Sequence, residues 1–452
     1  MRTSHPSGPS FDPSRGEPEA PAGKSRPTLS EITSVSLKVG LLSFGGPAAQ
    51  ISVMHQEFVE NRKWLSEERF LHALNYCMLL PGPEAQQLAT YCGWLSGRTL
   101  GGLISGLLFI LPGAIAMAIV SYVYAAFGET SLIAAVFYGV KAGVLAIVLQ
   151  ALMKIGKKAL KTRLAWFLCA ASFCALFFAA IPFPFVILGA AAIGLLLGRE
   201  TDALPESDPG VAATTIVKTA RTVLIGILIW VAPPIAAMLL LAPGNVLVEV
   251  AEFFSLLAVV SFGGAYALLS YMAQVAVETK SWITAGEMLD GLGLAETTPG
   301  PLILVTQFVG FLGGWRDPAP FSPLTGALLA AAMTTWVTFT PSFLFVLAGA
   351  PWMERLRGNR KLAHALSAIT AAVAGTILNL AVWFALNVLF SETGTLTLGP
   401  FDITWPNPGS LDPVLAGIAL GAAGLVFVLK RGIATVLAVT ALLGLMANFV
   451  LG

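Results

Sequence analysis

Four short segments combine helix-breaking residues with polar neighbours, which suits them to bind a solute. They are Ser43-Phe44-Gly45-Gly46 and Pro81-Gly82-Pro83 in the first half of the chain, and Ser261-Phe262-Gly263-Gly264 and Pro299-Gly300-Pro301 in the second. Proline removes a backbone donor and glycine frees the backbone, so neither motif sustains a helix. A helix that starts after such a break presents free N–H groups and the positive end of its dipole. This is an anion-binding arrangement that needs no buried lysine or arginine.

Polar side chains beside the breaks can complete such a site. Threonine hydroxyls and glutamine amides donate hydrogen bonds to an oxyanion without repelling it, so we expect them to bind substrate together with the breaks. The side chains concerned are Gln87, Thr297, Thr298 and Gln307. The alternative is that the breaks are kinks that only shape helix packing. The repetition of both motifs favours the functional interpretation.

Two carboxylates lie next to the Pro-Gly-Pro motifs. An ionisable residue inside a membrane is a functional candidate, and a carboxyl group near a dianion favours its protonated form. We therefore predict that Glu84 and Glu296 are proton-coupling groups. Glu84 follows its break and Glu296 precedes its own, so the two are not equivalent. The alternatives are that Glu84 complements a helix dipole and that Glu296 hydrogen-bonds to backbone.

The composition identifies a polytopic membrane protein. The chain has 452 residues, of which 56% are hydrophobic and 11% charged, and its mean hydropathy is +0.79. A soluble domain carries about 25% charged residues. The net charge of +1 and the absence of a basic cluster with aromatics do not favour a nucleic-acid partner. The four cysteines lie in apolar segments without metal-ligand spacing, and no phosphate-cradling motif is present, so we expect no metal, no cofactor and no enzymatic activity.

Hydropathy predicts an all-α protein with about thirteen transmembrane helices. The expected spans are 33–57, 69–96, 101–127, 132–153, 164–181, 183–198, 222–242, 249–276, 286–313, 322–350, 363–390, 411–429 and 432–451. Residues 1–30 are rich in proline, serine and charge and are expected to form a disordered cytoplasmic tail. The charged stretch 57–69 is expected to be an interfacial helix or a solvated loop. Lys141 lies deep in a span and either attracts an anion or extends to the membrane surface.

The positions of Lys and Arg favour a cytoplasmic N-terminus and a periplasmic C-terminus. If every span crosses the membrane, the basic loops 154–163, 199–221, 355–361 and 430–431 are cytoplasmic. The basic residues in periplasmic loops are then Arg62, Lys63, Arg69 and Arg316. The Pro-Gly-Pro segments could instead be re-entrant hairpins. Full crossing with an interrupted helix is the preferred alternative, because a re-entrant second segment would move 355–361 outside.

The motifs reveal an internal repeat. One shift of 218 positions, from 43 to 261 and from 81 to 299, superposes both motifs, and after an insertion a shift of 229 aligns Pro112 with Pro341. Seven crossings separate Ser43 from Ser261, and this odd number places the copies in opposite orientation. We therefore predict two inverted six-helix repeats, at 31–200 and 249–452, joined by a linker loop and a linker helix at 201–248. Inverted repeats are a recurrent plan of secondary transporters, with the site at the midplane interface.

Several of these segments resemble those of the long-chain, two-domain chromate ion transporters. The resemblance lies in Ser43–Pro47, in 70–89 with its Pro81-Gly82-Pro83-Glu84 run, in Ala295–Pro301 and in Thr335–Ser342, and it covers about 33–451. It implies a carrier in the bacterial inner membrane that exports chromate and confers chromate resistance. It also implies two homologous halves of opposite orientation. Ala265 occupies the position that corresponds to Pro47 of the first copy, so we expect the two halves to have different roles at the site.

Together these observations predict a secondary active transporter that exports chromate and is driven by the proton motive force or by exchange. A sulfate permease or a passive oxyanion channel on the same scaffold is the alternative. The expected partners are chromate, sulfate as a second anion, and the lipid bilayer. The oligomeric state stays open, with a homodimer among the options.

Overall fold

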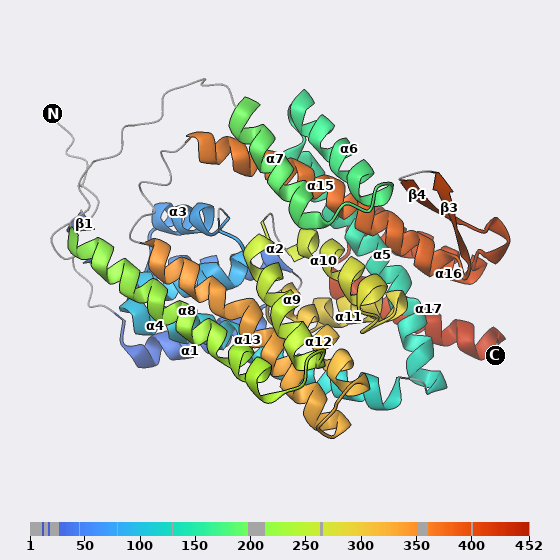
Figure 1. The fold of residues 1–452 in the computed structure, drawn as a ribbon, viewed down its shortest axis with the longest axis horizontal. Coiled ribbons are helices and arrows are strands. Elements are labelled where there is room, and N and C mark those ends of the chain that lie inside the picture. The colour runs from blue at the N-terminus through green and yellow to red at the C-terminus, as the bar shows by residue number, and fades with distance from the viewer. Residues whose placement is uncertain are drawn as a thin grey trace.

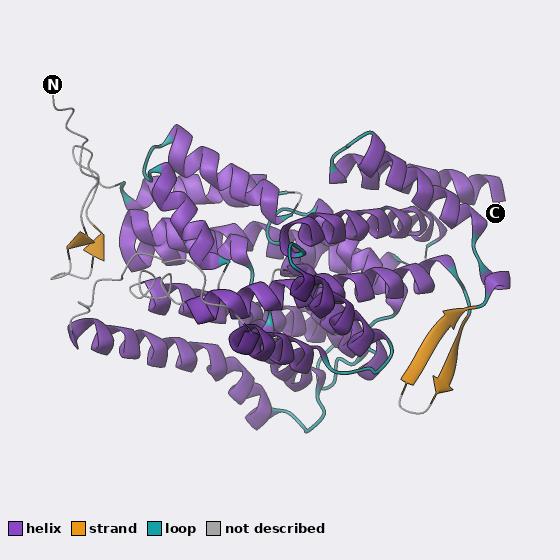
Figure 2. Cartoon of the chain, turned by 90° about the horizontal axis from the view of Figure 1, so that it is seen from above, coloured by secondary structure: helices purple, strands orange, loops and turns teal. Residues whose placement is uncertain are grey.

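The computed structural model describes residues 11–12, 17–18, 27–44, 46–78, 80–128, 130–197, 213–262, 265–350, 360–398 and 401–451. These residues form an almost entirely helical molecule (Figure 1), with one β-hairpin, β3 (Thr393–Leu398) and β4 (Phe401–Pro406), projecting at an edge (Figure 2). Most of the predicted tail, 1–30, lies outside the described residues. Within it, β1 (Phe11–Asp12) pairs with β2 (Glu17–Pro18).

Broken helices alternate with long ones in the first half of the chain. Its elements are α1 (Leu29–Leu42), α2 (Pro47–His55), the π-helix η1 (Gln56–Asn61), α3 (Glu67–Cys77), α4 (Glu84–Phe127), α5 (Ser131–Ala159), α6 (Arg163–Phe177) and α7 (Phe183–Leu197). Helix α4 contains non-helical backbone at Gly97 and Arg98, which divides it into arms at 84–96 and 99–127.

A single helix, α8 (Ala213–Leu240), connects the halves, and the second half repeats the order of the first. Its elements are α9 (Val246–Val260), α10 (Ala265–Ala273), η2 (Gln274–Thr279), α11 (Ala285–Thr297), η3 (Leu302–Leu304), α12 (Val305–Arg316), α13 (Pro323–Gly349), α15 (Arg360–Leu389), η5 (Pro408–Ser410), α16 (Pro413–Ala423), η6 (Gly424–Val428) and α17 (Ile433–Leu451). Helices α2 and α10, like η1 and η2, start and end exactly 218 positions apart, as the sequence repeat requires.

The predicted helix breaks are present. Helix α1 ends before Ser43 and α3 ends before Pro81, while α9 ends before Ser261 and α11 ends before Pro299. Gly46, Gly82 and Gly300 have φ angles of +82°, +113° and +91°, a region that L side chains rarely adopt. Capping side chains also repeat, since Ser66 starts α3 and Thr284 starts α11 at equivalent positions.

Each broken pair folds back on itself, and here the prediction of full crossing is wrong. Lys280, beyond η2, forms an ion pair with Glu249 in the first turn of α9 at 2.7 Å. Trp282 stacks on Phe254 of α9, and its carbonyl accepts from Arg316 at the end of α12 at 2.6 Å. The segments 249–276 and 286–313 are therefore two hairpins that enter and leave at one end, with the breaks at their tips.

The first half folds in the same way. Lys38 of α1 pairs with Glu57 of η1 at 2.7 Å, and a Cβ on Gly97 would lie 2.4 Å from Ile32 near the start of α1. The segments 33–57 and 69–96 are thus also hairpins. Glu57 is buried, contrary to the expected loop at 57–69, because this ion pair compensates its charge.

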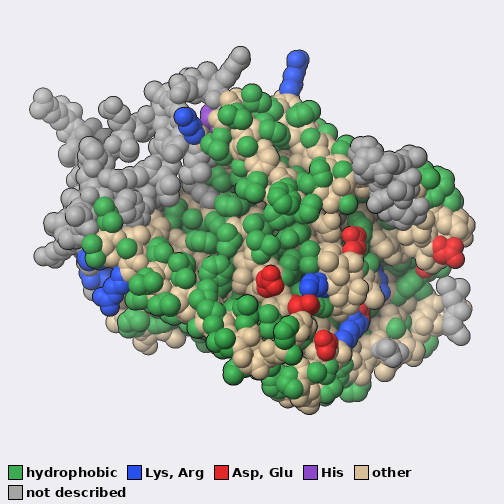
Figure 3. Space-filling model, viewed as in Figure 1, with side chains coloured by type: hydrophobic (Ala, Val, Ile, Leu, Met, Phe, Trp, Pro, Cys, Tyr) green, Lys and Arg blue, Asp and Glu red, His purple; other side chains and the backbone are tan. Residues whose placement is uncertain are grey.

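Fewer helices are long enough to cross a membrane than the thirteen predicted. Six described helices have the necessary length and apolarity, and four shorter apolar helices accompany them. The long helices lie in α4, α5, α8, α13, α15 and α17. Hydrophobic side chains cover most of the face in Figure 3, with few charged groups among them. This surface belongs to a multi-pass membrane protein.

The halves exchange helices. Helix α5 of the first half packs against α16 and α17, and α15 of the second half packs against α6 and α7. A Cβ on Gly444 would lie 2.4 Å from the carbonyl of Ala135, and one on Gly194 would lie 2.7 Å from the carbonyl of His364. Residues 135 and 364 differ by 229, so these two contacts are equivalent. Small residues at such crossings let membrane helices approach closely.

Candidate functional site

The tips of the hairpins meet through two hydrogen bonds between the halves. The N–H of Gly82 donates to the carbonyl of Ser261 at 3.0 Å, and the N–H of Gly300 donates to the carbonyl of Ser43 at 2.9 Å. Adding 218 to Gly82 leads to Gly300, and subtracting 218 from Ser261 leads to Ser43, so the two bonds are equivalent. Each Pro-Gly-Pro tip therefore rests on the Ser-Phe-Gly-Gly tip of the opposite half.

The long helices α4 and α13 contact the tips at equivalent places. A Cβ on Gly82 would lie 2.6 Å from Ser342 Oγ of α13, and one on Gly300 would lie 3.3 Å from Gly113 Cα of α4. Positions 113 and 342 differ by 229. Since α4 also packs against α13, the four breaks gather around this pair of helices.

Most of the predicted binding side chains donate to nearby carbonyls. These bonds are Ser43 to Val39 (2.6 Å), Ser261 to Ala258 (3.1 Å), Gln87 to Pro81 (2.6 Å), Thr297 to Gly293 (3.0 Å), Thr298 to Ala295 (3.5 Å) and Gln307 to Ala114 (2.8 Å). Ser43, Ser261 and Thr298 thereby donate to carbonyls in the last turn of a helix that ends at a break, where an unpaired carbonyl in an apolar surrounding is costly. The donors left for an anion are chiefly the backbone N–H groups at the helix starts.

The remaining predicted site residues shape the tips. Pro83 and Pro301 directly precede α4 and η3 and are buried, whereas Pro81 is half-buried and Pro299 is half-buried. Phe44 is 45% exposed and Phe262 is half-buried. Gly45, Gly263 and Gly264 lie outside the described residues.

The two carboxylates occupy different positions. Glu84 is the first residue of α4 and is half-buried, a place that suits both the proton-coupling prediction and the alternative of a helix-dipole partner. Glu296 is buried in the last turn of α11, and a Cβ on Gly46 would lie 3.9 Å from its Oε2. Glu296 therefore lies beside the start of α2, at the tip of the other half.

Sequence reasoning missed Gln50, which lies on α2 between the halves. Its Nε2 donates to the carbonyl of Gly300 at 2.7 Å, which ties the first tip to the second. The sequence pattern that could have identified Gln50 is a single amide side chain in an apolar helix directly after a break. In the described part of the chain, the buried Oε1 atoms of Gln50, Gln86 and Gln87 and the Oγ1 of Thr338 have no hydrogen-bond partner. These atoms are free to contact a solute or water.

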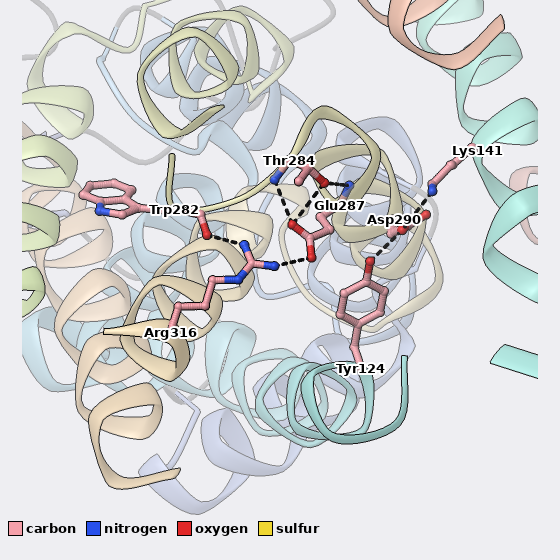
Figure 4. A network of polar contacts seen from close by, with 7 residues as sticks. All are labelled: Tyr124, Lys141, Trp282, Thr284, Glu287, Asp290 and Arg316. Atoms are coloured by element: carbon pink, nitrogen blue, oxygen red, sulfur yellow. Dashed lines mark hydrogen bonds and ion pairs between the residues drawn. The ribbon is translucent and has the colours of Figure 1, made fainter. Parts of the chain in front are cut away.

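A second polar network, also missed, joins α11 to α4 and α5 (Figure 4). Asp290 is buried, its Oδ2 accepts from Tyr124 Oη at 2.7 Å, and Lys141 Nζ lies 3.5 Å from the same oxygen. Lys141 was expected to attract an anion or to extend to the membrane surface. It pairs with a carboxylate of this chain, because a buried charge is stable only with compensation.

The described residues contain no group of three or more His, Cys, Asp or Glu side chains that could hold a metal ion. Cys77, Cys92 and Cys169 are buried and Cys174 is exposed, all four as free thiols.

Comparison with known proteins agrees with the resemblance. The chromate transporter family model matches residues 30–195 and 248–445. The chain is 33% identical over 406 residues to the chromate transport protein of Pseudomonas aeruginosa, covering 86% of this chain and 90% of that protein. It is 28% identical over 350 residues to a probable chromate transport protein of Synechococcus elongatus (77% and 83%), and 26% identical over 351 residues to the chromate transport protein of Cupriavidus metallidurans (77% and 81%). No solved structure matches. The chain therefore belongs to the chromate transporter family.

Proposed function

We propose that this protein is a secondary active transporter that exports chromate across the bacterial inner membrane and so confers chromate resistance. The observation that carries the proposal is the reciprocal contact of the tips, Gly82 with Ser261 and Gly300 with Ser43. It gathers four helix breaks, with their free N–H groups, in the interior of an apolar molecule. Broken backbone at membrane depth is tolerated where it is buried in protein or lines a substrate path.

The proposal places the halves in opposite orientation, with the first-half hairpins entering from the cytoplasm and the second-half hairpins from the periplasm. The hairpins support it through the positions of Lys and Arg. If residues 62–69 return to the side on which α1 begins, Arg62, Lys63 and Arg69 become cytoplasmic, and the described periplasmic ends retain Lys280 and Arg316. The bias of basic residues toward the cytoplasm is then stronger than with full crossing.

Substrate in this proposal binds at the N-termini of the half-helices. Chromate is a tetrahedral dianion, and helix starts bind such anions through N–H groups and the helix dipole. Thr338, one helical turn before Ser342 on α13, has a buried hydroxyl without a partner, and we expect it to donate as well. Sulfate has the same charge and shape, so we expect it to compete.

Transport is tested in everted membrane vesicles, in which export appears as uptake. We expect chromate to accumulate against its gradient, sulfate to compete, and a protonophore to abolish accumulation. A flux that only equilibrates the two sides would establish a passive channel instead. Uptake of sulfate without chromate uptake would establish a sulfate permease.

Proton coupling is tested with Glu84→Gln and Glu296→Gln, using the exposed Glu68→Gln as the matched control. We expect each of the first two changes to flatten the dependence of transport on pH, because an amide cannot exchange the proton. The control should keep the wild-type profile. Unchanged profiles in both site variants would exclude these carboxylates as the coupling groups.

A further inference from the structure

We infer that Asp290–Lys141 and Glu278–Trp383 form a gate on one side of the protein, and that Glu60 and Lys154 form its counterpart on the other side. The two gates close in turn as the transporter changes state. The inference deepens the proposed function, since it assumes a carrier with alternating access.

The first observation is an asymmetry between the halves. In the described residues, α10 packs against α15, and α11 packs against α5, α15 and α17. Their counterparts α2 and α3 pack instead against α4. Figure 1 shows α11 beside α5 and α17. On the side of α3, Lys158 of α5 reaches Met78 Sδ, directly after α3, at 3.8 Å. One pair of hairpins is thus packed more extensively against the α5–α15 helices than the other.

The closed side is held by polar contacts at two places, the buried Asp290 and the exposed Glu278. Asp290 of α11 contacts Lys141 of α5 at 3.5 Å and Tyr124 of α4 at 2.7 Å. The indole N–H of Trp383 on α15 donates to Glu278 of η2 at 2.8 Å. Such contacts connect a mobile hairpin to a scaffold with a defined geometry and can break without disturbing either helix.

The repeat identifies the equivalent positions on the open side. Subtracting 218 from Glu278 leads to Glu60, and subtracting 229 from Trp383 leads to Lys154. A hydrogen-bonded pair on the closed side thus corresponds to a pair of opposite charges on the open side. Lys154 lies 13 residues beyond Lys141 on α5, about 20 Å along the helix axis.

Glu60 and Lys154 have other partners in this state. Glu60 lies 3.3 Å from His55 Nδ1, and Lys154 donates to Gln150 at 3.4 Å. Both side chains are exposed, and no ion pair joins them among the described residues. If the halves exchange conformations, α2 and α3 close against α5 and bring this carboxylate to this ammonium group.

Two cysteine pairs report the state of each gate. They are introduced into a Cys174→Ser background, since the other three cysteines are buried. Because the native side chains meet only at their tips, a short bis-maleimide reagent is used to join the thiols. We expect it to cross-link Glu278→Cys/Trp383→Cys in the resting protein and to stop transport. We expect it to cross-link Glu60→Cys/Lys154→Cys during turnover.

Asp290→Asn should open the first gate. It should lower the cross-linking yield of Glu278→Cys/Trp383→Cys and raise that of Glu60→Cys/Lys154→Cys, by about fivefold or more, as is usual for coupled sites. Yields that change in the same direction would overturn the inference, as would a Glu60→Cys/Lys154→Cys pair that never cross-links. These readouts need no knowledge of the substrate, so they remain informative if chromate transport itself is not observed.

Charge reversal gives an independent test. Glu60→Lys and Lys154→Glu should each lower transport several-fold, and the double variant should restore it, because the pair is re-formed with opposite polarity. Loss of the His55 contact alone cannot be repaired by a change at position 154. Failure of the double variant to recover transport, with wild-type expression, would refute the second gate.

Discussion

The tip at Gly82 allows a quantitative test of how tightly the breaks are packed. Gly82 has a φ angle of +113°, and a Cβ there would lie 2.6 Å from Ser342 Oγ and 3.0 Å from Gln87 Nε2. Gly82→Ala should therefore incur about 1–2 kcal/mol of backbone strain. Overpacking of the tip should add about 1–3 kcal/mol. The total of about 2–5 kcal/mol should lower both thermal stability and transport.

Two glycines separate these contributions. Gly244 has a φ angle of +81° with nothing within 4 Å of an added Cβ, so Gly244→Ala should show the strain alone, about 1–2 kcal/mol. Gly189 in α7 has neither feature, so Gly189→Ala should be neutral or stabilising by up to about 1 kcal/mol. Ser342→Gly removes the nearest atom that the new methyl group would meet, while Gln87 Nε2 stays, and should therefore partly rescue Gly82→Ala.

The measurement is tryptophan fluorescence during thermal unfolding of the purified protein in detergent, together with vesicle uptake. From most to least stable, the expected order is Gly189→Ala, Gly244→Ala and Gly82→Ala. A Gly82→Ala protein as stable and as active as Gly189→Ala would refute the packing described at the tips. Lack of rescue by Ser342→Gly would show that the contact with Ser342 does not contribute to the loss of stability.

Two further changes probe contacts between the halves. Gln50→Leu removes the donor to the carbonyl of Gly300 and should destabilise the protein by about 1–3 kcal/mol. Gln50→Glu should destabilise it less than Gln50→Leu at acidic pH, where a protonated carboxyl can donate. Thermal unfolding at two pH values checks this. Gly194→Ala and Gly444→Ala should each lower the stability of the protein by about 1–3 kcal/mol, because both methyl groups would meet the backbone of the crossing helix. A variant as stable as the wild type would contradict the packing of α7 on α15 or of α17 on α5.

The positions of the breaks could be predicted from the sequence because they depend on local chemistry. The Gly-Gly and Pro-Gly-Pro motifs end helices at all four places, although other prolines lie inside α4, α8 and α13. The shift of 218 carried this result to the second half, where η2 repeats η1 without a residue of difference. The direction of the chain after each break could not be predicted. Hydropathy reports how apolar a segment is, and a hairpin and a full crossing of the same composition look alike.

The site was predictable in part for the same reason. The tips lie together, whereas the donor groups of Ser43 and Gln87 bind carbonyls of their own segments, four and six residues earlier in the chain. Pairs such as Lys141 with Asp290 join elements that are about 150 positions apart. No local pattern contains that information, since it arises only when the halves pack.

The tip hydrogen bonds also bear on how the protein is made. The N–H of Gly82 and the carbonyl of Ser43 become available as soon as the first half enters the bilayer, but their partners, Ser261 and Gly300, are synthesised roughly 180 to 260 residues later. Unpaired backbone groups in hydrocarbon cost several kcal/mol each. The tips of the first half must therefore stay hydrated or bound to other factors until the second half has been inserted. Biogenesis of this membrane protein is therefore the assembly of two incomplete halves. Neither half can reach its native state before the second half has been translated.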